Sequence, residues 1–213
     1  MAFGFVPASS QYLVVSGGPP VAARPYTFFA FVKRNTISAV SASFFGFGDS
    51  GSSTAVSVTY EATSTINNLE QVSSGASGTA TSIGVAPQGV WGDVLSECVS
   101  NVLRKAYYSY SSSGSSATDV TMPILDVFHV GTRRYSGSLG AFADHDIAEM
   151  AFWSVILTDN ERLSLSKGFK PHRVRPQSLV FYSPMVRELQ DLRGGKVITN
   201  TNGATVAPHP RMY

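Results

Sequence analysis

Three carboxylates and a histidine gather in residues 144–149, which read DHDIAE and continue as MAFW. The acids are Asp144, Asp146 and Glu149. Two facing carboxylates can hydrolyse a glycosidic bond, since one attacks the sugar or activates water while the other protonates the leaving group. In a regular strand, however, Asp144 and Asp146 share one face and Glu149 points to the other. A catalytic pair would need a β-bulge, so we expect no catalytic residues and no enzyme.

A calcium site is the second chemistry that these acids could support. Calcium is coordinated by several hard oxygen atoms, which Asp49, Asp144 and Asp146 could provide. Acids so scattered along the chain are more typical of solvated loops. None of the four histidines has a partner at metal-ligand spacing, and the single Cys98 excludes an internal disulfide and a Cys-based zinc site. We expect no cofactor, with calcium as the open alternative.

Glu149 also has a structural interpretation. A carboxylate in a strand that precedes a helix can accept hydrogen bonds from backbone amides or from a neighbouring arginine, and so fix that corner of the fold. Further along the same strand, Phe152 and Trp153 should alternate between the core and the face beneath the helix. We therefore predict structural roles for Glu149 and Trp153.

A short helix is predicted over residues 158–167, directly after this strand. Thr158 and Glu161 have the spacing of a capping box, in which each side chain bonds to the backbone amide of the other residue. Gly168 suits the position after the helix end, and Pro171 prevents its continuation. We predict that Thr158 and Glu161 stabilise this helix.

Short strand-like segments make up most of the remaining chain. Charged residues are only 14% of the sequence, and glycine, serine and proline separate about ten apolar or alternating stretches. No linker and no internal repeat divides the 213 residues. The pattern predicts an all-β fold in one domain, residues 1–213: two antiparallel sheets in a sandwich or jelly roll, with one short helix.

Several motifs resemble the concanavalin A-like, laminin-G-like jelly-roll domains, in particular those encoded by phages. The most specific is IAEMAFWSVILTDNE, which is similar to the family pattern Ile-Ala-Glu, Trp and Leu-Thr-x-x-Glu. In place of the usual Tyr-x-Asp-Gly turn, the chain has AYYSYSSSGS. The resemblance covers essentially the whole chain and implies a two-sheet lectin-like sandwich. The other matching segments are FVPASSQYL (5–13), TFFAFVK (27–33), FGFGDS (45–50) and Trp91.

Basic residues concentrate in the last quarter of the chain. Residues 162–213 carry nine Lys and Arg against two Asp and Glu, whereas residues 1–161 carry seven against twelve. The bases are scattered, which favours docking on an acidic protein over binding nucleic acid. By the resemblance, residues 170–213 form a basic segment that returns to the sandwich. The candidate partner-binding residues are Arg173, Arg175 and Arg211, together with Tyr107, Tyr108 and Tyr110 beside a serine-rich stretch.

The resemblance to phage-encoded domains implies a role in the virion. We expect a non-enzymatic virion structural protein that decorates the capsid and docks on capsid or tail proteins as a homo-oligomer, for example a trimer. The alternative is a glycan- or receptor-binding adhesion module on the phage tail, and the third is a glycan hydrolase. The N-terminus lacks the features of a signal peptide, and no apolar run approaches a membrane span. We therefore expect synthesis in the host cytoplasm, without membrane partners.

Overall fold

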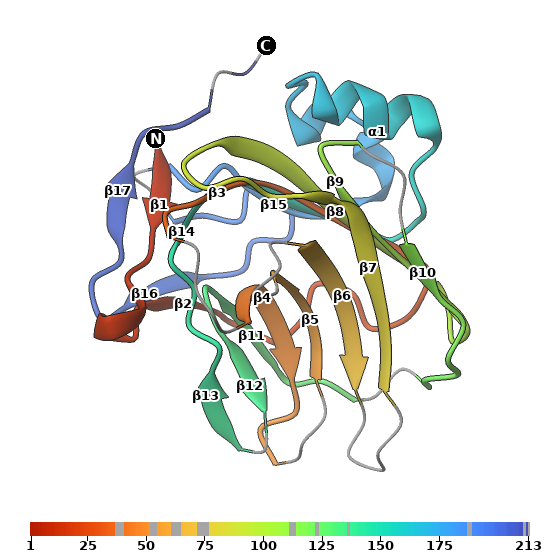
Figure 1. Ribbon diagram of the computed structural model, residues 1–213, viewed down its shortest axis with the longest axis horizontal. Helices are drawn as coiled ribbons and strands as arrows, with labels where there is room; N and C mark the ends of the chain where they lie inside the picture. Colours follow the sequence, from red (N-terminus) through yellow and green to blue (C-terminus); the bar gives the residue numbers. More distant parts are fainter. Residues whose placement is uncertain are drawn as a thin grey trace.

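Two antiparallel β-sheets face each other in the computed structural model (Figure 1). The structure describes residues 1–36, 41–51, 55–60, 65–71, 77–110, 114–121, 124–135, 137–186, 189–210 and 212. The predicted all-β sandwich with a single short α-helix is confirmed for these residues. No helix in these ranges is long and apolar enough to cross a membrane.

The first sheet has eight strands, and β14 (His145–Trp153) lies near its middle. β14 pairs with β3 on one side, and with both β1 and β15 on the other. In order, the sheet runs β10 (Gly114–Ser116), β9 (Leu103–Tyr108), β8 (Trp91–Ser100), β3 (Tyr26–Arg34), β14, β1 (Ala2–Gly4) and β17 (Thr205–Ala207), with β15 (Leu179–Ser183) also on β14.

The second sheet has seven strands, and a separate hairpin adds two short ones. The sheet runs β16 (Ile198–Thr201), β2 (Tyr12–Val15), β11 (Val127–Val130), β4 (Ala42–Gly48), β5 (Ala55–Tyr60), β6 (Thr65–Gln71) and β7 (Ser77–Val85). The hairpin is β12 (Arg133–Tyr135) with β13 (Ser138–Gly140), and the helical turns are η1 (Pro7–Ser9), η2 (Pro171–Arg173) and η3 (Pro176–Ser178). The C-terminal part of the chain thus adds β15 and β17 to the first sheet and β16 to the second.

Aromatic side chains fill the space between the sheets. Phe152 of β14 meets Phe47 of β4 with ring centroids 5.3 Å apart, so the two layers interlock at this point. Large rings bury much apolar area and prefer the tilted and edge-to-face contacts seen here. The largest members of this inner core are Phe28, Phe45, Phe47, Phe128, Phe152 and Phe181.

Part of the outer face of the first sheet is also buried, because α1 (Asp159–Ser166) and the turns after it cover it (Figure 1). Leu165 of the helix belongs to the same apolar cluster as Phe29 and Trp153 of the sheet. The Trp153 indole nitrogen donates to the carbonyl of Val174 at 2.8 Å. Phe152 faces the inner core and Trp153 the outer cluster, as predicted from their alternation.

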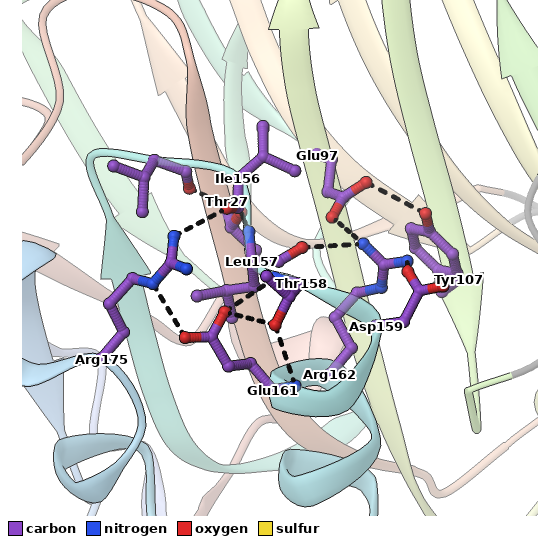
Figure 2. A network of polar contacts seen from close by, with 11 residues as sticks. Thr27, Glu97, Tyr107, Ile156, Leu157, Thr158, Asp159, Glu161, Arg162 and Arg175 are labelled. Carbon is purple, nitrogen blue, oxygen red and sulfur yellow. Dashed lines mark hydrogen bonds and ion pairs between the residues drawn. The ribbon is translucent and has the colours of Figure 1, made fainter.

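A buried ion pair joins α1 to the sheet, as Figure 2 shows. The Glu97 carboxylate of β8 is fully buried and lies 2.6 Å from the Arg162 guanidinium of the helix. It also accepts a hydrogen bond from the Tyr107 hydroxyl at 3.0 Å. Arg162 further donates to the carbonyl of Leu157 and pairs with the exposed Asp159. The helix therefore docks through charge-assisted bonds as well as through apolar contact.

The predicted capping box is present at the start of the helix (Figure 2). Thr158 Oγ1 accepts from the Glu161 amide, and the Glu161 carboxylate accepts from the Thr158 amide at 2.7 Å. The other Glu161 oxygen accepts from Arg175 Nε at 2.8 Å. Arg175, predicted to bind a partner, therefore holds the helix start, where the carboxylate lies within its reach.

Replacing Thr158 with alanine should lower the free energy of unfolding by about 1 kcal/mol, because the cap loses the acceptor for a helix amide. The measurement is urea denaturation followed by circular dichroism. Thr158→Ser keeps the hydroxyl and should stay close to the parent protein. Equal losses in both variants would contradict a capping role.

Candidate functional site

β14 contains a β-bulge at Glu149. Between Ala148 and Ala151 the strand advances three residues while its partner β3 advances two, from Phe31 to Phe29. Glu149 is the extra residue, and its φ is +55°, in the left-handed region that non-glycine residues rarely adopt. Such a conformation costs on the order of 1–3 kcal/mol and is concentrated at functional sites.

The bulge directs a buried carboxylate toward the C-terminal part of the chain. Glu149 is only 3% exposed, and its Oε2 accepts from the Tyr182 hydroxyl of β15 at 2.6 Å. His209 Nε2 lies 3.1 Å from the other carboxylate oxygen, Oε1. Burial, together with the bond to this carboxylate, raises the pKa of Tyr182, so its hydroxyl remains a donor.

These partners differ from the predicted ones. The sequence suggested backbone amides or an arginine for Glu149, because the residue precedes a capped helix. The bulge instead places its carboxylate beside Tyr182 and His209, and Glu97 is the buried acid that bonds the helix through Arg162. A structural role for Glu149 stays a prediction, but the residue acts beside Tyr182 and His209 and not at the corner next to the helix.

Glu149 lines a pocket of about 760 Å³, which we call the Glu149 pocket. Its walls come from β14, β15, the turns η2 and η3, and the chain after β17. The volume lies within the range of small-molecule sites. The polar lining residues are Glu149, Lys170, His172, Tyr182, Arg193 and His209. The apolar lining includes Pro176, Leu179, Pro184, Val186, Leu192 and Pro210, together with Met1 and Met212.

The loop that carries Arg193 is held by a buried aspartate. Asp191 Oδ1 accepts from the amides of Arg193 and Gly194, each at 3.0 Å, and from the Tyr182 amide at 3.1 Å. Arg193 Nε donates to the carbonyl of Leu179 at 3.0 Å. The guanidinium base is therefore tied to β15, whose Tyr182 also binds Glu149.

The three calcium candidates do not form a cluster. Asp49 accepts from the amide of Gly51 in its own turn, and Asp144 accepts from the Thr36 hydroxyl at 2.7 Å. Asp146 pairs with Lys33 at 2.5 Å. In the described ranges, no three His, Cys, Asp or Glu side chains lie close enough together to hold a metal ion.

The carboxylate pair of a glycosidase is likewise not assembled in the pocket. Although the bulge exists, Asp146 is bound to Lys33 and Asn35 and does not line the pocket. Glu149 is the only acid among the described lining residues. A hydrolase of this kind needs a second carboxylate on the opposite side of the bond.

Two of the predicted partner-binding tyrosines are buried. Tyr107 is 7% and Tyr108 5% exposed, because both faces of β9 are covered in this part of the sandwich. They pack the fold rather than present rings to a partner, which corrects the prediction. Tyr110 is 38% exposed and Arg173 is exposed, so both stay candidates. Arg211 lies outside the described residues.

The residues that complete the pocket have no recognisable pattern in the sequence. Tyr182 lies 33 residues after Glu149, and His209 lies in a proline-rich stretch near the end of the chain. The one available signal was a carboxylate between Ala148 and Met150, in the apolar part of the strand.

The chain is similar to known proteins in its fold and not in its sequence. No family model matches the chain, and no curated protein matches its sequence. Among solved structures, a native heptameric SAP-like pentraxin from Limulus polyphemus superposes with a TM-score of 0.67 at 13% identity, covering 98% of this chain and 94% of that one. A putative carbohydrate binding protein from Bacteroides ovatus gives 0.65 at 14% identity, covering 98% of this chain and 61% of that one.

A third similar structure is the CBM40 domain of the Ruminococcus gnavus IT-sialidase bound to alpha2,3 sialyllactose. It gives a TM-score of 0.58 at 12% identity and covers 68% of this chain and 84% of that one. The fold is a concanavalin A-like jelly roll. At these identities the likeness establishes the fold alone.

Proposed function

We propose that this jelly roll is a non-catalytic carbohydrate-binding module and that the sugar binds in the Glu149 pocket. The observation that carries the proposal is a buried carboxylate, held by Tyr182, that lines a hollow of about 760 Å³ with both apolar and polar walls. Large pockets with apolar walls and a few convergent polar groups are the usual form of ligand sites.

The chemistry of the lining suits a sugar. A carboxylate accepts several hydrogen bonds, and a sugar hydroxyl donates one, so Glu149 can bind hydroxyls while Tyr182 keeps it oriented. Proline and leucine side chains such as Pro176, Pro184 and Leu179 offer flat apolar surface to the carbon face of a ring. Two of the similar structures are described as carbohydrate-binding, which supports the same class of ligand.

Absence of catalysis belongs to the same proposal. It is supported by the single carboxylate among the described lining residues, since hydrolysis of a glycosidic bond generally uses two.

A glycan array followed by calorimetry tests the pocket. Wild-type protein should bind a subset of glycans, and Glu149→Gln should weaken that binding about tenfold or more, because a charged acceptor is lost. Tyr182→Phe removes only the hydroxyl and should weaken binding by a smaller factor. Asp119→Asn, an exposed acid outside the pocket, is the matched control.

Thermal melting of each variant separates binding from folding. Glycan binding that survives unchanged in both folded pocket variants would overturn the proposal, as would no binding to any glycan on the array.

The virion location predicted from the sequence remains a second proposal. It is supported by the resemblance of the sequence motifs to phage-encoded domains, and by exposed bases such as Arg173 that could dock on an acidic capsid or tail protein. A decorating protein and a tail adhesin differ in copy number and place, so a reconstruction of the particle would distinguish them. Light scattering of the purified chain would test the predicted homo-oligomer.

A further inference from the structure

We infer that the ligand of the Glu149 pocket is an anionic sugar, whose carboxylate or sulfate group is bound by Arg193 and Lys170. This inference rests on the proposed function and adds the chemical class of the ligand. The cations on the described pocket lining, Lys170 and Arg193, are exposed, whereas its single acid, Glu149, is buried.

Two exposed cations line the pocket without a counter-ion among the residues that the structure describes. Neither Lys170 nor Arg193 has an ion pair with any described residue, although both are exposed and both line the hollow. The single acid among the described lining residues, Glu149, is buried and already contacts Tyr182 and His209. The exposed charges on the described lining are therefore positive, and they favour a ligand that brings negative charge.

Arg193 is positioned before any ligand arrives. Its backbone is fixed by Asp191, and its Nε is bonded to the Leu179 carbonyl at 3.0 Å. The two terminal nitrogens have no partner among the described residues. A guanidinium anchored in this way can bind two oxygens of a carboxylate or sulfate with little further loss of freedom.

Lys170 adds a second cation on another element. It lies directly before η2 (Pro171–Arg173), whose His172 also lines the pocket. Since Arg193 and Lys170 come from separate segments, both lining the same hollow, an anionic group between them would bind two independent donors. This arrangement differs from a solvated basic face, in which the charges lie outside any hollow.

Glu149 then determines the orientation of the ligand. A carboxylate repels an anionic group, so the acidic end of the sugar should lie toward Arg193 and Lys170. The neutral hydroxyls should lie toward Glu149, which accepts hydrogen bonds. The pocket therefore selects a ligand with one charged group and several hydroxyls, rather than a uniformly charged polyanion.

The test compares matched acidic and neutral sugars. The probes are oligogalacturonates and sialylated oligosaccharides, their carboxyl methyl esters, and O-sulfated oligosaccharides with their unsulfated parents. Binding is measured by calorimetry at low and at moderate salt. We expect at least one acidic sugar to bind tenfold or more tightly than its neutral counterpart. We also expect its affinity to fall as salt is raised.

The variants Arg193→Gln and Lys170→Gln should each weaken binding of the acidic sugar severalfold, with little effect on the neutral one. Arg173→Gln removes an exposed charge from η2 that does not line the pocket, and should leave the affinity unchanged. A preference for carboxylated sugars identifies one source of the anion, and a preference for sulfated sugars the other.

Three results would overturn the inference. If the methyl esters bind as tightly as the acids while Glu149→Gln still abolishes binding, the ligand is neutral and the proposed function stands. If Arg173→Gln weakens binding as much as Arg193→Gln, the attraction is diffuse and there is no anion site. If neither acidic nor neutral sugars bind, the proposed function fails, and the inference fails with it.

Discussion

Replacing Glu97 with alanine should destabilise the protein by about 3–5 kcal/mol, because one member of a buried ion pair is lost. The Glu97 side chain is fully buried, and that of its partner Arg162 is 12% exposed. Without the carboxylate, the guanidinium would stay in a low-dielectric place beside the Tyr107 ring, and its remaining described polar partners would be the Leu157 carbonyl and the exposed Asp159. The hydrogen bond from the Tyr107 hydroxyl to Glu97 would also be lost.

The measurement is the free energy of unfolding from urea denaturation, and the chain offers two matched comparisons. Asp159 binds the same arginine but is 80% exposed, so Asp159→Ala should cost only up to about 1 kcal/mol. The double variant Glu97→Leu with Arg162→Leu removes both charges, and should be more stable than Glu97→Ala alone. Equal losses in the free energy of unfolding for Glu97→Ala and Asp159→Ala would show that the buried pair stabilises the fold no more than the exposed one.

Acidification below neutral pH should destabilise the fold, because two histidines are buried in their neutral form. Burial lowers the pKa of His145 to about 3 and that of His129 to about 4, from 6.5. His145 lies between the rings of Phe5 and Phe44, and neither of its ring nitrogens has a hydrogen-bond partner among the described residues. Protonating either ring inside the fold would place an unpaired charge there.

Proton linkage gives the sign of this change in stability with pH. Between pH 6.5 and the folded-state pKa, the unfolded chain binds protons at these histidines and the folded chain does not. Their contribution is therefore complete above pH 6.5 and is lost progressively as the pH falls toward 4 and 3. Burial raises the pKa of Asp93 to about 6 from 3.8, which acts in the opposite sense between pH 3.8 and 6. Two histidines outweigh one aspartate, so the net effect of acid is a loss of stability.

Urea denaturation at a series of pH values measures this loss, and His145→Leu tests its source. The leucine variant removes two buried, unpaired nitrogens, so it should be at least as stable as the parent at pH 7 and clearly more stable at pH 5. We expect the difference at pH 5 to be on the order of 1–2 kcal/mol, since one pKa unit corresponds to about 1.4 kcal/mol. Parallel pH curves for the parent and the variant would exclude His145 as the source.

The sequence predicted the features that depend on neighbours in the chain. The helix followed from Thr158 and Glu161, three residues apart, and the opposite orientation of Phe152 and Trp153 followed from strand alternation. The sandwich fold followed from short apolar segments that glycine, serine and proline separate. Each of these patterns involves residues that are close together in the chain, so it can be recognised without knowing the tertiary structure.

The pocket could not be predicted because it depends on a bulge and on distant segments. A regular strand would have placed Glu149 on the opposite face from Asp146, and nothing local marks the extra residue. Its partners Tyr182 and His209 come from segments that reach β14 only through the pairing of β15 and β17 in the same sheet. The burial of Tyr107 was missed for a related reason, because α1 covers a sheet face that ordinarily contacts solvent.

The pairing of β1 with β17 has a practical consequence for any study of this protein. Ala2 lies opposite Ala207, so the first and the last strand pair at one edge of the first sheet (Figure 1). Met1 and Met212 both line the Glu149 pocket. A fluorophore placed at either end would therefore report directly on ligand entry. An affinity tag used to tether the protein to a sensor chip would obstruct the same opening, and attachment through the exposed Lys167 after α1 would leave it accessible.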